Sequence, residues 1–102
     1  MNMPQDLVSS LTELLASRSL DLPLIASAAD VIAADARFNH WVALEAKRTL
    51  SSDAVLQIVG DYEDATEACQ SAIAKFRATR DGKSLQEVLN ETLLVLRRHT
   101  AR

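Results

Sequence analysis

Carboxylates are the densest group of side chains in this sequence that could do chemistry. Four of them fall within one short segment, namely Asp61, Glu63, Asp64 and Glu67. Neighbouring carboxylates can act as general acid and base or bind a metal ion, and at helical spacing these four form two pairs. A di-iron bundle would also need Glu-x-x-His pairs, which the sequence lacks. We therefore interpret the cluster as a solvated helix face that is matched to Arg97 and Arg98.

The two histidines and the single cysteine are not spaced as metal ligands. His40, Cys69 and His99 lie far apart in the sequence, and no two of them have the short spacing that is typical of a zinc site. We predict no metal, no cofactor and no catalytic residue. Cys69 falls on an apolar helical stripe, which predicts a small buried side chain in a reducing compartment. His99 is interpreted as a cation that complements the C-terminus of the last helix.

Residues 53–102 predict two amphipathic helices joined by a short turn. The first has an apolar stripe with alternating steps of four and three residues, close to a heptad repeat. Its members are Val55, Val59, Tyr62, Thr66, Cys69, Ile73 and Phe76. Gly82 is expected to end this helix in a left-handed conformation. Ser84 would then cap the last helix, with Glu87 completing a capping box.

Both helices of this hairpin carry acidic residues early and basic residues late. In the last helix, Glu87 and Glu91 come first, and Arg97, Arg98 and Arg102 follow. These charges complement the helix dipole, and antiparallel packing brings opposite charges together at both ends. Exposed ion pairs contribute only about 0–1 kcal/mol each. The charge pattern therefore favours antiparallel packing of the two helices, and it is not the main source of stability.

Residues 5–50 predict two or three further helices. Apolar residues recur at helical spacing from Leu7 to Leu15, and Pro23 both interrupts this helix and fits the first position of the next. The apolar face then shifts near Phe38, which leaves open whether one helix or two continue to Leu50. We predict a single domain over residues 1–102, an all-α antiparallel bundle of four or five helices with a C-terminal helical hairpin turning at Gly82.

Composition excludes several classes of function. A net charge of −3 and a pI near 5.2 argue against general binding of nucleic acid or anionic membranes. The one basic cluster is Lys75, Arg77, Arg80 and Lys83, offset by Asp81. No apolar run approaches membrane-spanning length, and the first residues do not read as a secretory signal. We expect a cytoplasmic protein, and the excess of Arg over Lys with abundant Ala is typical of a GC-rich bacterial genome.

The segment Leu11-Thr12-Glu13-Leu14-Leu15-Ala16-Ser17-Arg18 resembles the opening helix of small helical chorismate mutases. The resemblance covers eight residues and implies a substrate-binding role for Arg18. Outside the matched segment, Arg37 and Lys47 are the other candidate anion ligands for such an enzyme. The chain departs from that family where Pro23 interrupts the helix and where the expected C-terminal Gln is absent. A chorismate-mutase-like enzyme is therefore the alternative interpretation, followed by a nucleic-acid-binding regulator.

The leading hypothesis concerns four residues in the first half of the chain. Arg37, Phe38, His40 and Trp41 lie where the helix phase is ambiguous, which makes them the predicted partner-binding surface. The alternative is that their aromatic rings fill the core. A surplus of apolar faces over what short helices can bury would favour a homodimer. We expect a protein that acts through protein contacts, as an adaptor, regulator or secretion-chaperone-like protein or as a homodimer, and not as an enzyme.

Overall fold

A computed structural model of the chain describes residues 7–18, 20–46 and 52–100. They form four helices, α1 (Leu7–Ala16), α2 (Leu22–Ala46), α3 (Ser52–Thr79) and α4 (Gly82–Thr100). The predicted all-α fold is thus confirmed, with four helices packed compactly against one another. None of the described helices is both long enough and apolar enough to cross a membrane.

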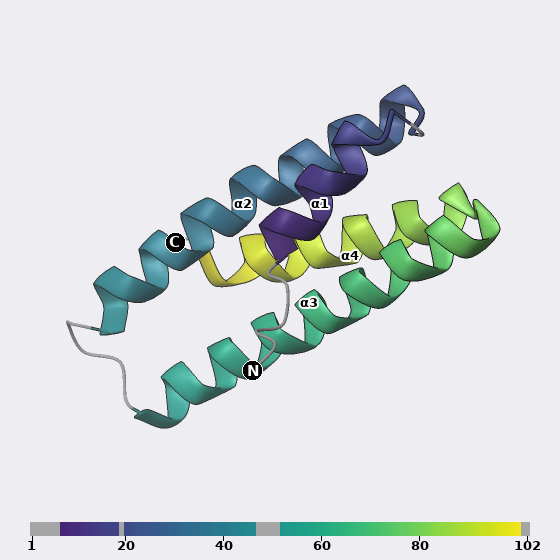
Figure 1. Cartoon of the computed structure of the whole chain (residues 1–102). Helices are drawn as coiled ribbons and strands as arrows, with labels where there is room; N and C mark the ends of the chain where they lie inside the picture. Colours follow the sequence, from purple (N-terminus) through teal and green to yellow (C-terminus); the bar gives the residue numbers. More distant parts are fainter. Residues whose placement is uncertain (1–6, 19, 47–51, 101–102) are drawn as a thin grey trace, which may run out of the picture.

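The fourth helix holds the arrangement together. α4 packs against both α2 and α3, and α1 lies against the same two helices. Figure 1 shows α1 alongside the first part of α2, and α4 running back beside α3. The molecule measures 43 × 33 × 19 Å along its principal axes. Its smallest dimension is about two helix diameters, so the helices form a flat, two-layered body.

The core lies where all four helices meet. Its main residues are Leu7, Leu11 and Leu14 of α1, Ala28, Val31 and Phe38 of α2, Cys69, Ile73 and Phe76 of α3, and Leu85, Leu89 and Leu96 of α4. The predicted stripe of α3 is buried only in its second half, whereas Val55 and Val59 are half-buried. The reason is that α3 begins well beyond the end of α4 (Figure 1), so its first turns lack that neighbour.

α2 runs unbroken through the segment whose continuity the sequence left open. Its buried residues Leu24, Ala28, Val31 and Phe38 keep helical spacing throughout. Asn39 donates a hydrogen bond to the backbone carbonyl of Asp35, 2.9 Å away. The shift of the apolar face near Phe38 is therefore accommodated within one helix that continues to Ala46.

The turn between α3 and α4 differs from the expectation in where the left-handed residue lies. Arg80 has a φ of 59°, whereas no glycine among the described residues has a positive φ. Gly82 is instead the first residue of α4. A Cβ on Gly82 would lie 3.2 Å from Cδ1 of Leu24. Gly82 thus lies at a close approach between α4 and α2, and it does not supply the left-handed backbone of the turn.

Aspartates cap the N-termini of α4 and α2. The cap of α4 is Asp81 and not the predicted Ser84. Asp81 accepts hydrogen bonds from the backbone N–H and the hydroxyl of Ser84, at 3.1 and 2.7 Å, and these bonds lower the pKa of Asp81. Asp21 accepts a bond from the backbone N–H of Leu24 at 3.0 Å. Pro23 therefore occupies the second helical position of α2 rather than the first. Asp caps as effectively as Ser, which is why spacing alone misplaced these boundaries by one to three residues.

Replacing Gly60 by alanine is expected to raise the free energy of unfolding by about 1 kcal/mol. Gly60 lies inside α3, and a Cβ added there would meet no heavy atom within 4 Å. The methyl group therefore restricts the unfolded chain without a clash in the folded one. Urea denaturation followed by circular dichroism measures the change. An unchanged or lower stability would show that a neighbour approaches the backbone at Gly60.

Candidate functional site

The predicted partner-binding residues divide between a surface groove and the core. Arg37, His40 and Trp41 of α2 line an open groove of about 440 Å³ together with Arg97 and Thr100 of α4. Phe38 is only 2% exposed and lies in the core. One step along a helix turns the side chain by about 100°, which separates Phe38 from Arg37. Three of the four residues therefore share a surface, and the fourth supports it from within.

Two arginines and a histidine line this groove. The side chains of Arg37, His40 and Arg97 are exposed, and Trp41 is half-buried beside them. In the described part of the chain, neither arginine has a carboxylate within ion-pair distance. Arginine binds carboxylates through paired hydrogen bonds and stacks on aromatic groups. The groove can therefore hold an acidic group beside an apolar one. We refer to it as the cationic groove.

Aromatic packing fixes the inner side of α2. The ring of Phe38 stacks on Tyr62 of α3, with 4.8 Å between centroids and 6° between planes. His99 of α4 meets Phe38 edge-on at 6.1 Å, and Trp41 lies 6.3 Å away. Phe38 thus joins α2, α3 and α4 directly beneath the groove.

A buried carboxylate lies next to this aromatic packing. Asp35 is 5% exposed, and it accepts a 2.6 Å hydrogen bond from the hydroxyl of Tyr62 and a 3.1 Å bond from the amide of Asn39. Burial raises the pKa of Tyr62, and the hydrogen bond to Asp35 raises it further. The tyrosine therefore keeps its proton and acts as a donor that ties α3 to α2.

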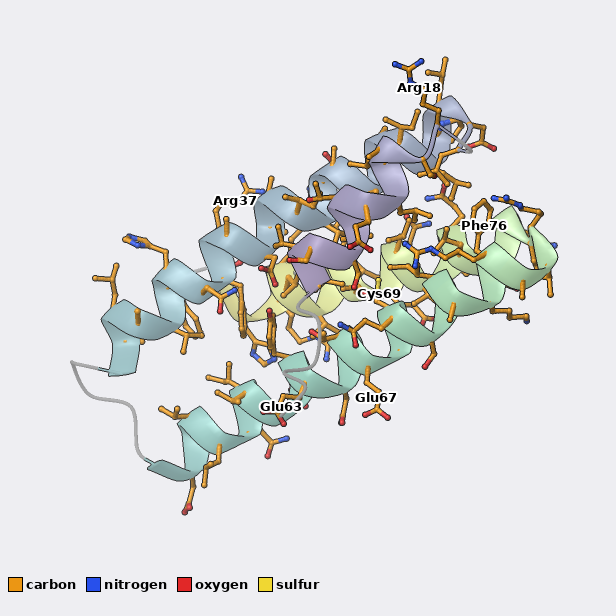
Figure 2. All side chains as sticks on the ribbon, in the orientation of Figure 1. Arg18, Arg37, Glu63, Glu67, Cys69 and Phe76 are labelled. Carbon is orange, nitrogen blue, oxygen red and sulfur yellow. The ribbon has the colours of Figure 1, made fainter. Side chains whose placement is uncertain are left out.

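His99 lies in the last turn of α4, where the sequence placed it, and it also contacts a carboxylate of α3. Its Nε2 lies 3.0 Å from Oδ2 of Asp61, and its side chain is only 15% exposed. It therefore links α4 to α3 rather than standing free at a helix end. The other members of the acidic cluster are exposed, and Figure 2 shows Glu63 and Glu67 pointing away from the body of the molecule. The predicted match between this cluster and Arg97 and Arg98 is not formed as ion pairs.

The predicted basic cluster is largely engaged within the chain. Lys75 lies 3.9 Å from Asp81, and Arg77 lies 3.6 Å from Glu13 of α1. Arg80 lies over the ring of Phe76, with 5.7 Å from its guanidinium carbon to the ring centroid. Two of the four cations thus have a carboxylate neighbour within the described part of the chain, and a third lies on an aromatic ring. The nucleic-acid alternative therefore gains no support from the geometry.

The arginines of the enzyme alternative do not share a pocket. Arg18 follows the end of α1, with a φ of 56°, and Figure 2 places it far from Arg37. Lys47 lies outside the described residues. Within residues 7–18, 20–46 and 52–100, no group of three or more His, Cys, Asp or Glu side chains could hold a metal ion.

Comparison with protein-family models gave no match, and comparisons with curated proteins and with solved structures gave none either. The site is therefore interpreted from its own geometry. Sequence reasoning missed Arg97 and Thr100 as partners of Arg37, because no signal showed that the end of α4 lies against α2. It also missed Asp35, although a carboxylate in step with Val31 and Phe38 on an apolar stripe predicts a buried hydrogen-bond acceptor.

Proposed function

We propose that this chain is a small cytoplasmic helical protein that acts through protein contacts, as an adaptor, regulator or secretion-chaperone-like protein. Its helices form an antiparallel bundle in which the hairpin of α3 and α4 is the scaffold, and its partner binds in the cationic groove. The observation that carries this proposal is the convergence of Arg37, Arg97 and Trp41 in one groove, where neither arginine forms an ion pair with another described residue.

The shape of the groove favours a protein segment over a small molecule. Small-molecule sites usually enclose about 70–90% of the ligand surface, whereas the cationic groove is open to solvent. An amphipathic helix can lie in such a groove with its apolar side against an aromatic anchor. Here Trp41 and the aliphatic stems of the arginines would supply the apolar contact. The partner chemistry that fits is a helical segment with carboxylates beside leucine-like residues.

The test uses Trp41 as its own reporter, since it is the only tryptophan in the chain. Titration with a helical peptide that carries Glu beside Leu is expected to change the Trp41 emission at low salt, with weaker binding as salt rises. The Arg37→Glu/Arg97→Glu variant should bind more than ~10-fold more weakly, because each reversal opposes a partner carboxylate.

A matched control reverses the same number of charges elsewhere. Arg18 and Lys83 are exposed and lie outside the groove, so Arg18→Glu/Lys83→Glu should bind the peptide as the wild type does. Circular dichroism checks that both variants remain helical. The same pair of variants applies to affinity purification from the native host. Equal retention of a partner by the groove variant and the wild type would reject the groove as its binding site.

A further inference from the structure

The outward face of α4 carries a stripe of residues that the single chain does not use. Glu87, Glu91, Leu94 and Arg98 follow one another at helical spacing, and all four are exposed. Leu94 is 62% exposed and is the one large apolar side chain among the four. Among the described residues, none of the three charged members takes part in an ion pair. We call these four residues the α4 stripe.

A mainly apolar groove runs beside the α4 stripe, between α3 and α4. It has a volume of about 210 Å³. Its apolar surface comes from Ala65 and Ala68 of α3 and Val88 and Val95 of α4. The rest of its lining is Asp61, Asp64, Glu91 and Thr92. A cavity of ~150 Å³ accepts a benzene ring, so this groove has room for a branched aliphatic side chain. The two alanines also let another helix approach closely.

We propose that a second copy of this chain covers this face. The two α4 helices pack antiparallel about a two-fold axis near Leu94, and the Leu94 side chain of each copy enters the α3–α4 groove of the other. A two-fold interface brings the same patch of both subunits together. That requirement is met here because Leu94 and the groove that receives it are neighbours on one face.

The charge order along the α4 stripe favours a second copy over an unrelated protein. Acidic Glu87 and Glu91 precede Leu94, and basic Arg98 follows it. An antiparallel copy reverses this order, so Arg98 of each subunit lies opposite the glutamates of the other. A parallel copy would place like charges together. The stripe is therefore complementary to itself in one orientation only, and α4 is about 28 Å long, with room for both sets of contacts.

Sedimentation equilibrium and light scattering test the proposal directly. The wild-type chain is expected at twice the monomer mass of 11.2 kDa. Leu94→Asp should raise the dissociation constant by ~100-fold or more, because two buried leucines are lost for each dimer. Since Leu94 is exposed in the single chain, this variant should retain its helical circular dichroism. Leu22→Asp is the matched control, because Leu22 is 80% exposed and lies on α2.

Charge exchange tests the antiparallel orientation. Arg98→Glu and Glu87→Arg should each weaken the dimer, whereas the double variant Arg98→Glu/Glu87→Arg should restore it. A wild-type chain that stays monomeric at high concentration would overturn the proposal, as would a dimer insensitive to Leu94→Asp. A dimer that only Arg37→Glu/Arg97→Glu dissociates would show that the two copies meet at the cationic groove. That result would also overturn the proposal. None of these outcomes tests the binding of a foreign partner, which is a separate measurement.

Discussion

Replacing Phe38 by alanine is expected to lower the free energy of unfolding by about 3–5 kcal/mol. Phe38 is 2% exposed and contacts aromatic rings of α2, α3 and α4. Truncation therefore removes buried apolar area, leaves a cavity and breaks the stack with Tyr62. Domains of this size have total free energies of unfolding of about 5–15 kcal/mol, so the variant loses a large part of its stability. Urea denaturation followed by circular dichroism measures the loss.

Trp41→Ala is the matched control for this prediction. Trp41 is half-buried at the edge of the cationic groove, so its loss should cost well under half as much stability as the loss of Phe38. It should instead weaken partner binding. Equal destabilisation by the two substitutions would show that Trp41 belongs to the core and would remove the aromatic wall of the groove.

The sequence predicted helix content better than helix ends. Apolar stripes of α1, α3 and α4 follow from periodicity, because a helix must bury one face whatever its neighbours are. The turn at Arg80 and the cap at Asp81 did not follow, since Gly82 and Ser84 matched the usual signals equally well. In the fold, Gly82 lies against Leu24 of α2, where an added Cβ would be 3.2 Å from its Cδ1. That contact joins residues far apart in sequence, which local patterns do not report.

The cationic groove could be predicted only in part for the same reason. Arg37, His40 and Trp41 were identified together because they are close in sequence, where the helix phase is ambiguous. Arg97 completes the groove from α4, and only the packing of α4 against α2 brings it there. The place of Phe38 in the core also depended on a partner, Tyr62 of α3. Site residues within one element could be predicted, whereas those that meet across elements required the fold.

Raising the pH from 9 to 11 is expected to remove about 2 kcal/mol of stability through Cys69. Cys69 is fully buried, and burial raises the pKa of its thiol from 9.0 to about 11, while a hydrogen bond between Cys69 and Thr92 acts in the opposite direction. Below pH 9 the thiol is protonated in both states, and its contribution is fully present. Between these values the unfolded chain loses a proton that the folded chain keeps. Unfolding is then favoured increasingly until the folded thiol also ionises.

Denaturation at a series of pH values in wild type and Cys69→Ala separates this effect from other alkaline titrations. The alanine variant is less stable at neutral pH but should lose less stability between pH 9 and 11, because it has no thiol to ionise. The raised pKa of Tyr62 acts in the same direction above its ordinary value of 10.0, so Tyr62→Phe should flatten part of the remaining slope. Parallel pH profiles for wild type and Cys69→Ala would contradict a buried, protonated Cys69.

Burial also predicts that thiol reagents modify Cys69 at neutral pH only as fast as the bundle opens, because the thiolate is the reactive form.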